Sequence, residues 1–98
     1  MRPSELLAQP GAWTQGWPAR KANGRLCMAR NPEAVQWCIV GALRKTNSAQ
    51  FILGAFWSMP PTLRTALHAR GYHSLSRYND APGRTQDEVV ALLIEAGL

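Results

Sequence analysis

Apolar residues are densest between Asn31 and Thr46, in the sequence NPEAVQWCIVGALRKT. On a helical projection they fall on nearly every side, which predicts a helix buried in the core rather than one lying on a surface. Asn31 suits the N-cap, and Pro32 suits the first helical position because no N–H is needed there. Gly41 interrupts the apolar pattern, and the close approach of another backbone would explain it. We predict a central helix over about residues 32–45, around which the other elements pack.

Weaker helical patterns lie on both sides of this stretch. Thr85 and Glu88 form the pattern of a capping box, which predicts the start of the last helix. Pro61 and Gly71 are suited to the start and the end of another helix. The further predicted helices cover residues 4–9 with Ser4 as the cap, residues 47–57, residues 61–70 and residues 85–96.

The dipeptide Asn23-Gly24 is the clearest sign of β structure. Two-residue hairpin turns need positive φ at both central positions, which asparagine and glycine adopt at little cost. We therefore predict a small β-hairpin near residues 19–28. Residues 72–78 alternate weakly between apolar and polar and predict a short extended piece, whereas residues 79–83 predict a loop.

Length and composition indicate one globular domain. The chain has 98 residues, of which 46% are hydrophobic, a fraction typical of globular proteins. We predict a single domain over residues 1–98 that is mainly α: a compact bundle of about four helices around the central helix, with the hairpin beside it. No apolar run reaches the roughly 18 residues of a membrane span, and the N-terminus lacks the apolar core of a signal peptide. We expect a cytoplasmic protein with no membrane partner.

Positive charge is concentrated in the first part of the chain. Residues 1–77 carry ten Lys and Arg against two acidic residues, a balance of +8, whereas residues 78–98 carry one Arg against four acidic residues, a balance of −3. Nine of the eleven cations are arginine, whose planar fork suits phosphate and carboxylate groups. Such a basic body favours an acidic protein surface, a nucleoprotein complex or nucleic acid as the partner. A merely solvated basic surface is the alternative interpretation.

The candidate binding residues lie in and before the predicted hairpin. Four cations lie on or near the hairpin, and two tryptophans precede it in a Gly- and Pro-rich segment. They are Arg20, Lys21, Arg25, Arg30, Trp13 and Trp17. A basic hairpin can contact nucleic acid or an acidic partner, and exposed tryptophans can anchor one. The alternatives are a strand edge whose charges prevent unwanted pairing, and tryptophans that cover the core.

Catalytic and metal-binding patterns are weak. Cys38, His73 and Asn79 occur in the order of a papain-like Cys–His–Asn site. A cysteine two turns inside a buried helix is a poor place for a thiolate, so we expect Cys38 to be a small buried hydrophobe. Cys27 and Cys38, taken with His68 and His73, lack the short cysteine spacing of structural zinc sites. We expect no metal, no cofactor and no catalysis, and keep a small cysteine-dependent hydrolase as an alternative.

Two segments resemble an uncharacterised family of small bacterial and phage proteins. The first is PEAVQWC followed by GAL, at residues 32–38 and 41–43, and the second is ND, GRT and EV within residues 79–89. The family pattern is a Trp-Cys-x-x-Gly-Ala-Leu helix and an Asn-Asp-x-x-Gly-Arg-Thr loop that opens the last helix. This chain has Tyr78 where the family more often has Trp. The resemblance implies a small α-helical domain, often carried by phages or mobile elements, and supplies no established activity.

The resemblance groups Cys38 and Gly41 with four residues of the second segment, Asn79, Asp80, Arg84 and Thr85. We expect the loop to pack on the central helix, with Arg84 either clasping the loop or forming a wall of a small site. The expected function is a non-catalytic binding protein that acts by stoichiometric contact. By analogy, it could be a phage or mobile-element protein that inhibits a host defence nucleoprotein complex. A direct nucleic-acid-binding protein is a second alternative.

Overall fold

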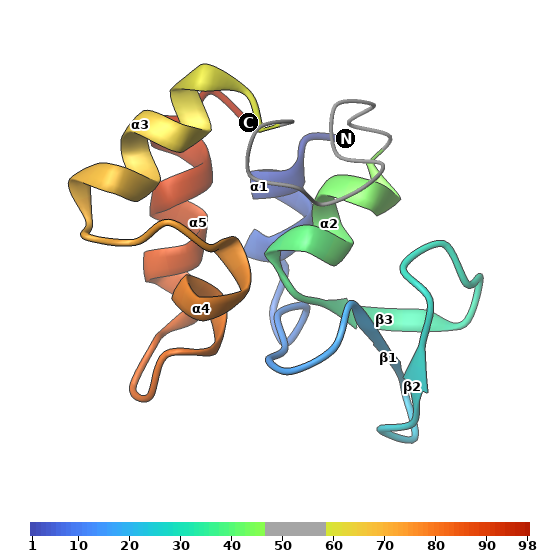
Figure 1. The fold of residues 1–98 in the computed structure, drawn as a ribbon. Coiled ribbons are helices and arrows are strands. Elements are labelled where there is room, and N and C mark those ends of the chain that lie inside the picture. The colour runs from blue at the N-terminus through green and yellow to red at the C-terminus, as the bar shows by residue number, and fades with distance from the viewer. Residues whose placement is uncertain (47–58) are drawn as a thin grey trace.

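The computed structural model describes residues 1–46 and 59–98 of the chain. Within these ranges five helices and one three-stranded sheet form the regular structure (Figure 1). In chain order the elements are α1 (Pro3–Ala8), β1 (Ala19–Lys21), β2 (Leu26–Cys27), β3 (Ala34–Trp37), α2 (Ile39–Lys45), α3 (Pro61–Ala69), α4 (Leu75–Asp80) and α5 (Gln86–Glu95).

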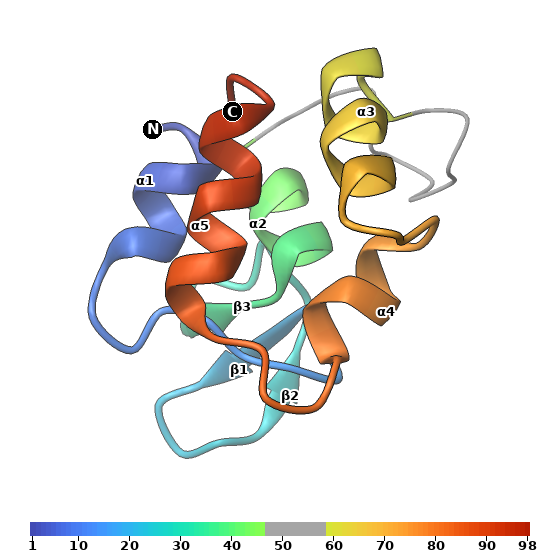
Figure 2. The same ribbon diagram turned by 90° about the vertical axis from the view of Figure 1, so that its left-hand side faces the viewer.

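The helices pack together at one end of the molecule, and the sheet lies at the other end (Figure 1). α5 packs against α1 and α3, whereas α2 packs against α1 and α4. Figure 2 shows α1 and α5 side by side. The largest fully buried apolar side chains come from four of these helices: Leu7, Ile39, Leu43, Leu63, Leu67, Val89, Leu92 and Leu93. The largest part of the core therefore lies between the helices, and Ala19, Cys27 and Trp37 of the sheet join it. The described structure thus combines five helices with a small sheet.

The predicted hairpin is confirmed. β1 pairs antiparallel with β2, and Gly24 in the turn has a φ of +83°. The turn itself is a three-residue loop over residues 22–24 rather than the two-residue turn predicted, because the Lys21 N–H donates to the Arg25 carbonyl at 2.9 Å. β3 pairs with the other side of β1, which gives the strand order β2-β1-β3. Ala19 lies opposite both Cys27 and Trp37, and all three side chains are buried. Because side chains alternate across a strand, this row forms the inner face of the sheet.

The predicted helix over residues 32–45 is wrong in its first half. Residues 34–37 form β3, and α2 begins only at Ile39. Asn31 caps no helix: its Oδ1 accepts the Glu33 N–H at 2.8 Å, an Asx turn that leads into the strand. As a strand, residues 34–37 extend the sheet on the side of β1 that β2 leaves open. This pairing outweighs a local helical pattern, because propensity is a weak preference beside tertiary contacts.

The second half of that prediction is confirmed. The buried residues of α2 are Ile39, Gly41, Ala42 and Leu43. Another backbone does approach Gly41 closely, because a Cβ there would overlap the carbonyl oxygen of Pro18. The same carbonyl accepts the Cys38 N–H at 3.2 Å. The loop before β1 therefore crosses directly over the first turn of α2.

The extended piece predicted over residues 72–78 is also wrong. Ser74 caps α4 instead, and its side-chain oxygen accepts a first-turn N–H at 3.2 Å. α4 buries Leu75, Tyr78 and Asn79, which have helical i, i+3, i+4 spacing. One of the three is polar, and this hid the helical pattern. Asn79 and Asp80 consequently belong to the last turn of α4 rather than to a loop.

The remaining helix predictions have mixed outcomes. α3 and α5 are confirmed, and the capping box forms: the Thr85 N–H donates to Glu88 Oε1 at 2.9 Å and the Glu88 N–H donates to Thr85 Oγ1 at 3.2 Å. α1 is confirmed too, but Ser4 is buried inside it and is not its cap. The helix predicted over residues 47–57 lies outside the described residues. Within the described ranges, no helix is long and apolar enough to span a membrane.

Candidate functional site

Asn79 is the polar centre where three segments meet. Its side chain is 99% buried, with a relative exposure of 1%. Oδ1 accepts the indole N–H of Trp13 at 2.8 Å and the backbone N–H of Ile39 at 3.1 Å. Nδ2 donates to the Thr14 carbonyl at 3.1 Å and to Asp80 Oδ1 at 2.9 Å. A carboxamide has two acceptor and two donor positions, so Asn79 is fully satisfied and ties α4 to α2 and to the loop before β1.

The neighbours of Asn79 fix the same loop. Asp80 Oδ1 accepts the Gly16 N–H at 2.9 Å. Gln15 Nε2 donates to the carbonyls of Asn79 at 2.9 Å and Ala81 at 3.3 Å. The loop is therefore held on the C-terminal end of α4 by polar contacts on both sides of Asn79. The expected packing of the second segment on the first is present, but through α4 rather than through a loop.

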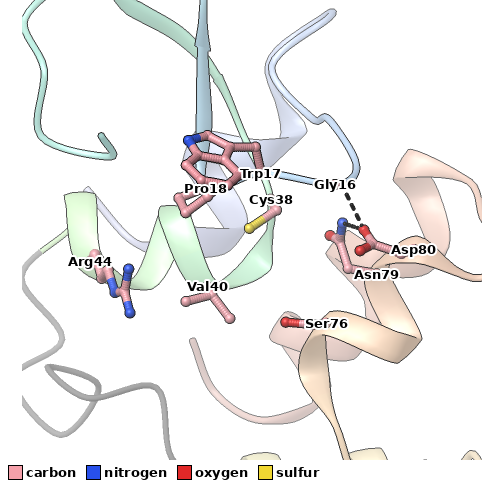
Figure 3. A pocket seen from close by; sticks show the side chains of 9 residues that line it. All are labelled: Gly16, Trp17, Pro18, Cys38, Val40, Arg44, Ser76, Asn79 and Asp80. Atoms are coloured by element: carbon pink, nitrogen blue, oxygen red, sulfur yellow. Dashed lines mark hydrogen bonds between the residues drawn. The ribbon is translucent and has the colours of Figure 1, made fainter. Parts of the chain in front are cut away.

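A pocket of about 210 Å³ lies where this loop, α2 and α4 meet (Figure 3). The loop contributes residues 16–18. The other lining residues are Cys38, Val40, Arg44, Ser76, Asn79 and Asp80. The pocket thus combines a cation, a carboxylate, a carboxamide, a thiol and a hydroxyl with the Trp17 ring. It is the candidate site for a small ligand.

Cys38 lies at the N-cap of α2, not two turns inside a helix as predicted. Its Sγ accepts the Gly41 N–H at 3.3 Å, and the residue is buried as expected. Burial raises the pKa of the Cys38 thiol, and the hydrogen bonds from Gly41 and Val40 N–H groups oppose this only in part. The nearby Asp80 carboxylate raises it further. The thiol is therefore protonated at neutral pH.

The papain-like constellation is not assembled. Asn79 shares the pocket with Cys38, but its carboxamide is fully used, and no histidine is among the described residues that line the pocket. The His73 ring instead packs edge-on against His68, with 4.3 Å between ring centroids. Cys27 lies in the inner face of the sheet. In residues 1–46 and 59–98, no group of three or more His, Cys, Asp or Glu side chains could hold a metal ion.

Arg84 clasps the turn that joins α4 to α5. Its Nε donates to the Tyr78 carbonyl at 2.8 Å, and its guanidinium carbon lies 3.7 Å from the Tyr78 ring centroid. Its Nη1 also forms an ion pair with Glu88 at 3.4 Å. Of the three residues predicted to form the clasp or small site, Asn79 and Asp80 line the pocket, whereas Arg84 faces a separate hollow beside Tyr72. Arg84 positions the turn rather than forming a wall of the pocket.

Several of the candidate binding residues make contacts within the protein. Arg20 donates to Thr14 Oγ1 at 3.0 Å and also to the Gly24 and Gln15 carbonyls, so it braces the hairpin. Lys21 forms an ion pair with Glu33 at 3.4 Å. Trp13 is half-buried and held by Asn79, as described above.

The other three candidate residues are at the surface. Arg25 and Arg30 are exposed, and Arg30 Nε donates to the Arg44 carbonyl at 3.1 Å. Trp17 is 44% exposed and forms part of the pocket. Three of the six candidate residues are thus half-buried and engaged in contacts within the protein, and three are exposed.

Three exposed apolar side chains that were not predicted from the sequence lie on or beside the sheet. Leu26 is 50% exposed, Met28 66% and Val35 46%. Leu26 and Met28 flank the buried Cys27, so strand alternation could have placed them outward. Val35 was hidden because its segment was predicted to be a helix. Arg44 and Ser76 were missed as pocket residues because only the tertiary fold brings them together.

Comparison with known proteins adds one result. A model of a family of unknown function, DUF6197, matches residues 3–97. The chain belongs to DUF6197. This confirms that the chain belongs to a family of unknown function, and the match covers almost the whole chain. No curated protein and no solved structure matches the chain. In this DUF6197 protein the two segments singled out in the sequence are in direct contact, through Asn79 and the N-terminus of α2.

Proposed function

We propose that this DUF6197 protein is a non-catalytic binding protein that acts by stoichiometric contact. The observation that supports the proposal is the exposure of Leu26, Met28 and Val35 next to arginines. Single exposed apolar residues are ordinary, but large apolar side chains that share one small surface with arginine are typical of protein interfaces. Aromatic, Met and Arg side chains are enriched there, whereas Lys and Glu are depleted.

The docking surface is the outer face of the sheet. Arg20 lies opposite Leu26 on one side and opposite Gln36 on the other. Alternation places this row on the face opposite to Ala19 and its buried partners. We define the outer sheet face as Arg20, Leu26 and Gln36, with Met28 and Val35 beside them. Because Arg20 is fixed by internal hydrogen bonds, this surface is ordered before a partner arrives, which lowers the entropic cost of binding.

Charge selects the class of partner. Exposed Arg25 and Arg30 lie close to the outer sheet face in the chain, and residues 1–77 carry a balance of +8. An acidic protein surface complements this charge and would bind faster through electrostatic attraction. The class of acidic partners that we propose includes the protein components of nucleoprotein complexes. By analogy, a phage or mobile-element protein that binds the acidic surface of a host defence complex would inhibit that complex without any catalysis.

The test is a pull-down of the tagged chain from a lysate of its native host, with and without nuclease. The informative variant carries Leu26→Ser and Met28→Ser, and Ile94→Ser is the control because Ile94 is 63% exposed on α5, away from the sheet. We expect one acidic protein to be retained after nuclease by the wild type and the control, and to be lost from the double variant. The purified pair should then form a complex of fixed stoichiometry.

Two outcomes would overturn the proposal. If recovery disappears with nuclease, and affinity for nucleic acid falls linearly on a log–log plot against salt, the protein binds nucleic acid directly. If the double variant retains the same partner as the wild type, the outer sheet face is not the docking surface. The cysteine hydrolase alternative receives no support from the buried, protonated thiol of Cys38.

A further inference from the structure

The pocket beside Cys38 is separate from the outer sheet face. Its lining comes from residues 16–18, the α2 segment and α4, and includes none of the residues of that face (Figure 3). Its volume of about 210 Å³ is below the roughly 300–1,000 Å³ of pockets for drug-sized ligands. A ligand that fits here is therefore small.

Arg44 brings an uncompensated positive charge to the pocket. No ion pair or side-chain hydrogen bond of its guanidinium occurs among the described residues. Its Nε is enclosed, and in the described part of the chain it is the one buried side-chain nitrogen or oxygen without a hydrogen-bond partner. A half-buried guanidinium without a counter-charge is costly, and a ligand carboxylate is the planar anion that matches its geometry.

Asp80 brings a fixed negative charge to the opposite side. Figure 3 shows Arg44 on α2 and Asp80 on α4, with Cys38 and Val40 between them. Asp80 Oδ1 is held by the Gly16 N–H and by Asn79 Nδ2, both at 2.9 Å, so the carboxylate cannot turn toward Arg44 without breaking these bonds. Both charges act on the thiol between them: Asp80 raises the pKa of Cys38 and Arg44 lowers it.

The surface between the two charges is largely apolar. Trp17, Pro18 and Val40 line it, and Trp17 remains 44% exposed. Val40 and Arg44 are four residues apart in α2 and so lie on one face of the helix. The pocket therefore offers a cation, a short apolar wall and an anion in sequence.

We propose that this pocket binds a small zwitterion whose carboxylate pairs with Arg44 and whose ammonium group pairs with Asp80. Its short aliphatic body lies against Trp17 and Val40. Free amino acids and ω-amino acids are the chemical class that fits. A doubly charged anion does not fit, because Asp80 would repel it. The inference is independent of the proposed docking function, since it rests on different residues.

The experiment titrates the full chain with 4-aminobutyrate, 5-aminopentanoate and 6-aminohexanoate, which vary the spacing of the charges. Glycine and L-leucine represent α-amino acids. Pentanoate and pentylamine are the singly charged controls. Binding is followed by the indole resonance of Trp17 and the Nε–H resonance of Arg44 in ¹⁵N NMR spectra. We expect at least one zwitterion to bind at least tenfold more tightly than either control and to shift both resonances.

Two variants remove one charge each with little effect on the fold. Arg44→Gln removes a side chain that makes no ion pair in the described structure, and Asp80→Asn keeps an oxygen that can accept the Gly16 N–H. Each should weaken zwitterion binding at least tenfold. Arg77→Gln, an exposed residue of α4 outside the pocket, should leave it unchanged. The Leu26→Ser and Met28→Ser variant should also bind normally, which separates this site from the docking surface.

Three results would overturn the inference. Equal affinity for pentanoate and 5-aminopentanoate would reveal a simple anion site. Unchanged binding by both charge variants would place the ligand elsewhere. If no zwitterion at 50 mM shifts the Trp17 and Arg44 resonances, the pocket has no such ligand.

Discussion

Gly41 shows how one missing side chain positions the site. A Cβ atom at position 41 would overlap the carbonyl oxygen of Pro18, which belongs to the backbone and cannot rotate away as a side chain could. We predict that Gly41→Ala destabilises the protein by about 2 kcal/mol. Overpacking costs about 1–3 kcal/mol, here near the upper end, and the gain in helix propensity returns only about 1 kcal/mol. Urea unfolding would measure the change.

Gly83→Ala is the matched control. Gly83 has a φ of +79° but open space around it, so alanine there meets only the backbone penalty of about 1 kcal/mol. Gly41→Ala should therefore be the more harmful change, and it alone should shift the Trp17 indole resonance. Equal stability of Gly41→Ala and the wild type would show that the loop carrying Pro18 can move away from α2 at little energetic cost.

Cys38 gives a second residue-scale prediction. Its thiol is buried, its pKa is raised by that burial, and its Sγ already accepts the Gly41 N–H. Because the thiolate is the reactive form, iodoacetamide should label Cys38 at pH 7.5 at least about 100-fold more slowly in the folded protein than in urea. Peptide mapping would separate it from Cys27, which is also buried. Faster labelling in the folded state would revive the hydrolase alternative.

At the scale of elements, the predictions were correct where the sequence pattern depends only on residues that are near one another in the chain. The hairpin around Asn23-Gly24, the Thr85 capping box and the apolar spacing of α3 need no distant partner, and each formed where it was predicted. Only the length of the hairpin turn differs, since residues 22–24 form a three-residue loop between Lys21 and Arg25. The strand at residues 34–37 depends on β1 for its hydrogen bonds. Such a pairing cannot be predicted from the sequence of residues 34–37 alone. The helix at residues 75–80 was missed because Asn79, a buried polar residue, interrupts its apolar face.

The site was predictable only in outline. The family resemblance grouped Cys38 with Asn79 and Asp80, and these residues do meet. Nothing local to Arg44 or Ser76 indicates that they face the same pocket. The four hydrogen bonds of Asn79 join positions 40 to 66 residues apart, apart from the one to its neighbour. Such contacts follow from the tertiary fold and not from spacing.

At the scale of the whole molecule, the acidic C-terminal segment does not form a separate negative face. Glu95 pairs with Arg70 at 2.8 Å and Glu88 pairs with Arg84 at 3.4 Å. These pairs connect α5 to the end of α3 and to the turn after α4. They use two of the eleven cations and leave the charge of the hairpin region to dominate the surface near the sheet.

The same two carboxylates predict how stability depends on pH. The hydrogen bond and charge of Arg70 lower the pKa of Glu95 below its ordinary 4.5, and the Thr85 N–H, with help from Arg84, lowers the pKa of Glu88. A carboxyl group with a lower pKa in the folded state stabilises it above the ordinary pKa, and this contribution is lost as the pH falls through the folded value. We therefore expect the urea concentration at the midpoint of unfolding to fall as the pH is lowered from 5 to 3.

Glu88→Gln and Glu95→Gln should each make that fall shallower. Asp87→Asn is the control and should leave it unchanged, because the Asp87 side chain forms no ion pair in the described structure. Because both carboxylates are at the surface, 0.5 M NaCl should weaken the part that depends on the arginines. A fall of the wild-type size in both glutamine variants would show that these pairs do not couple α5 to the rest of the fold.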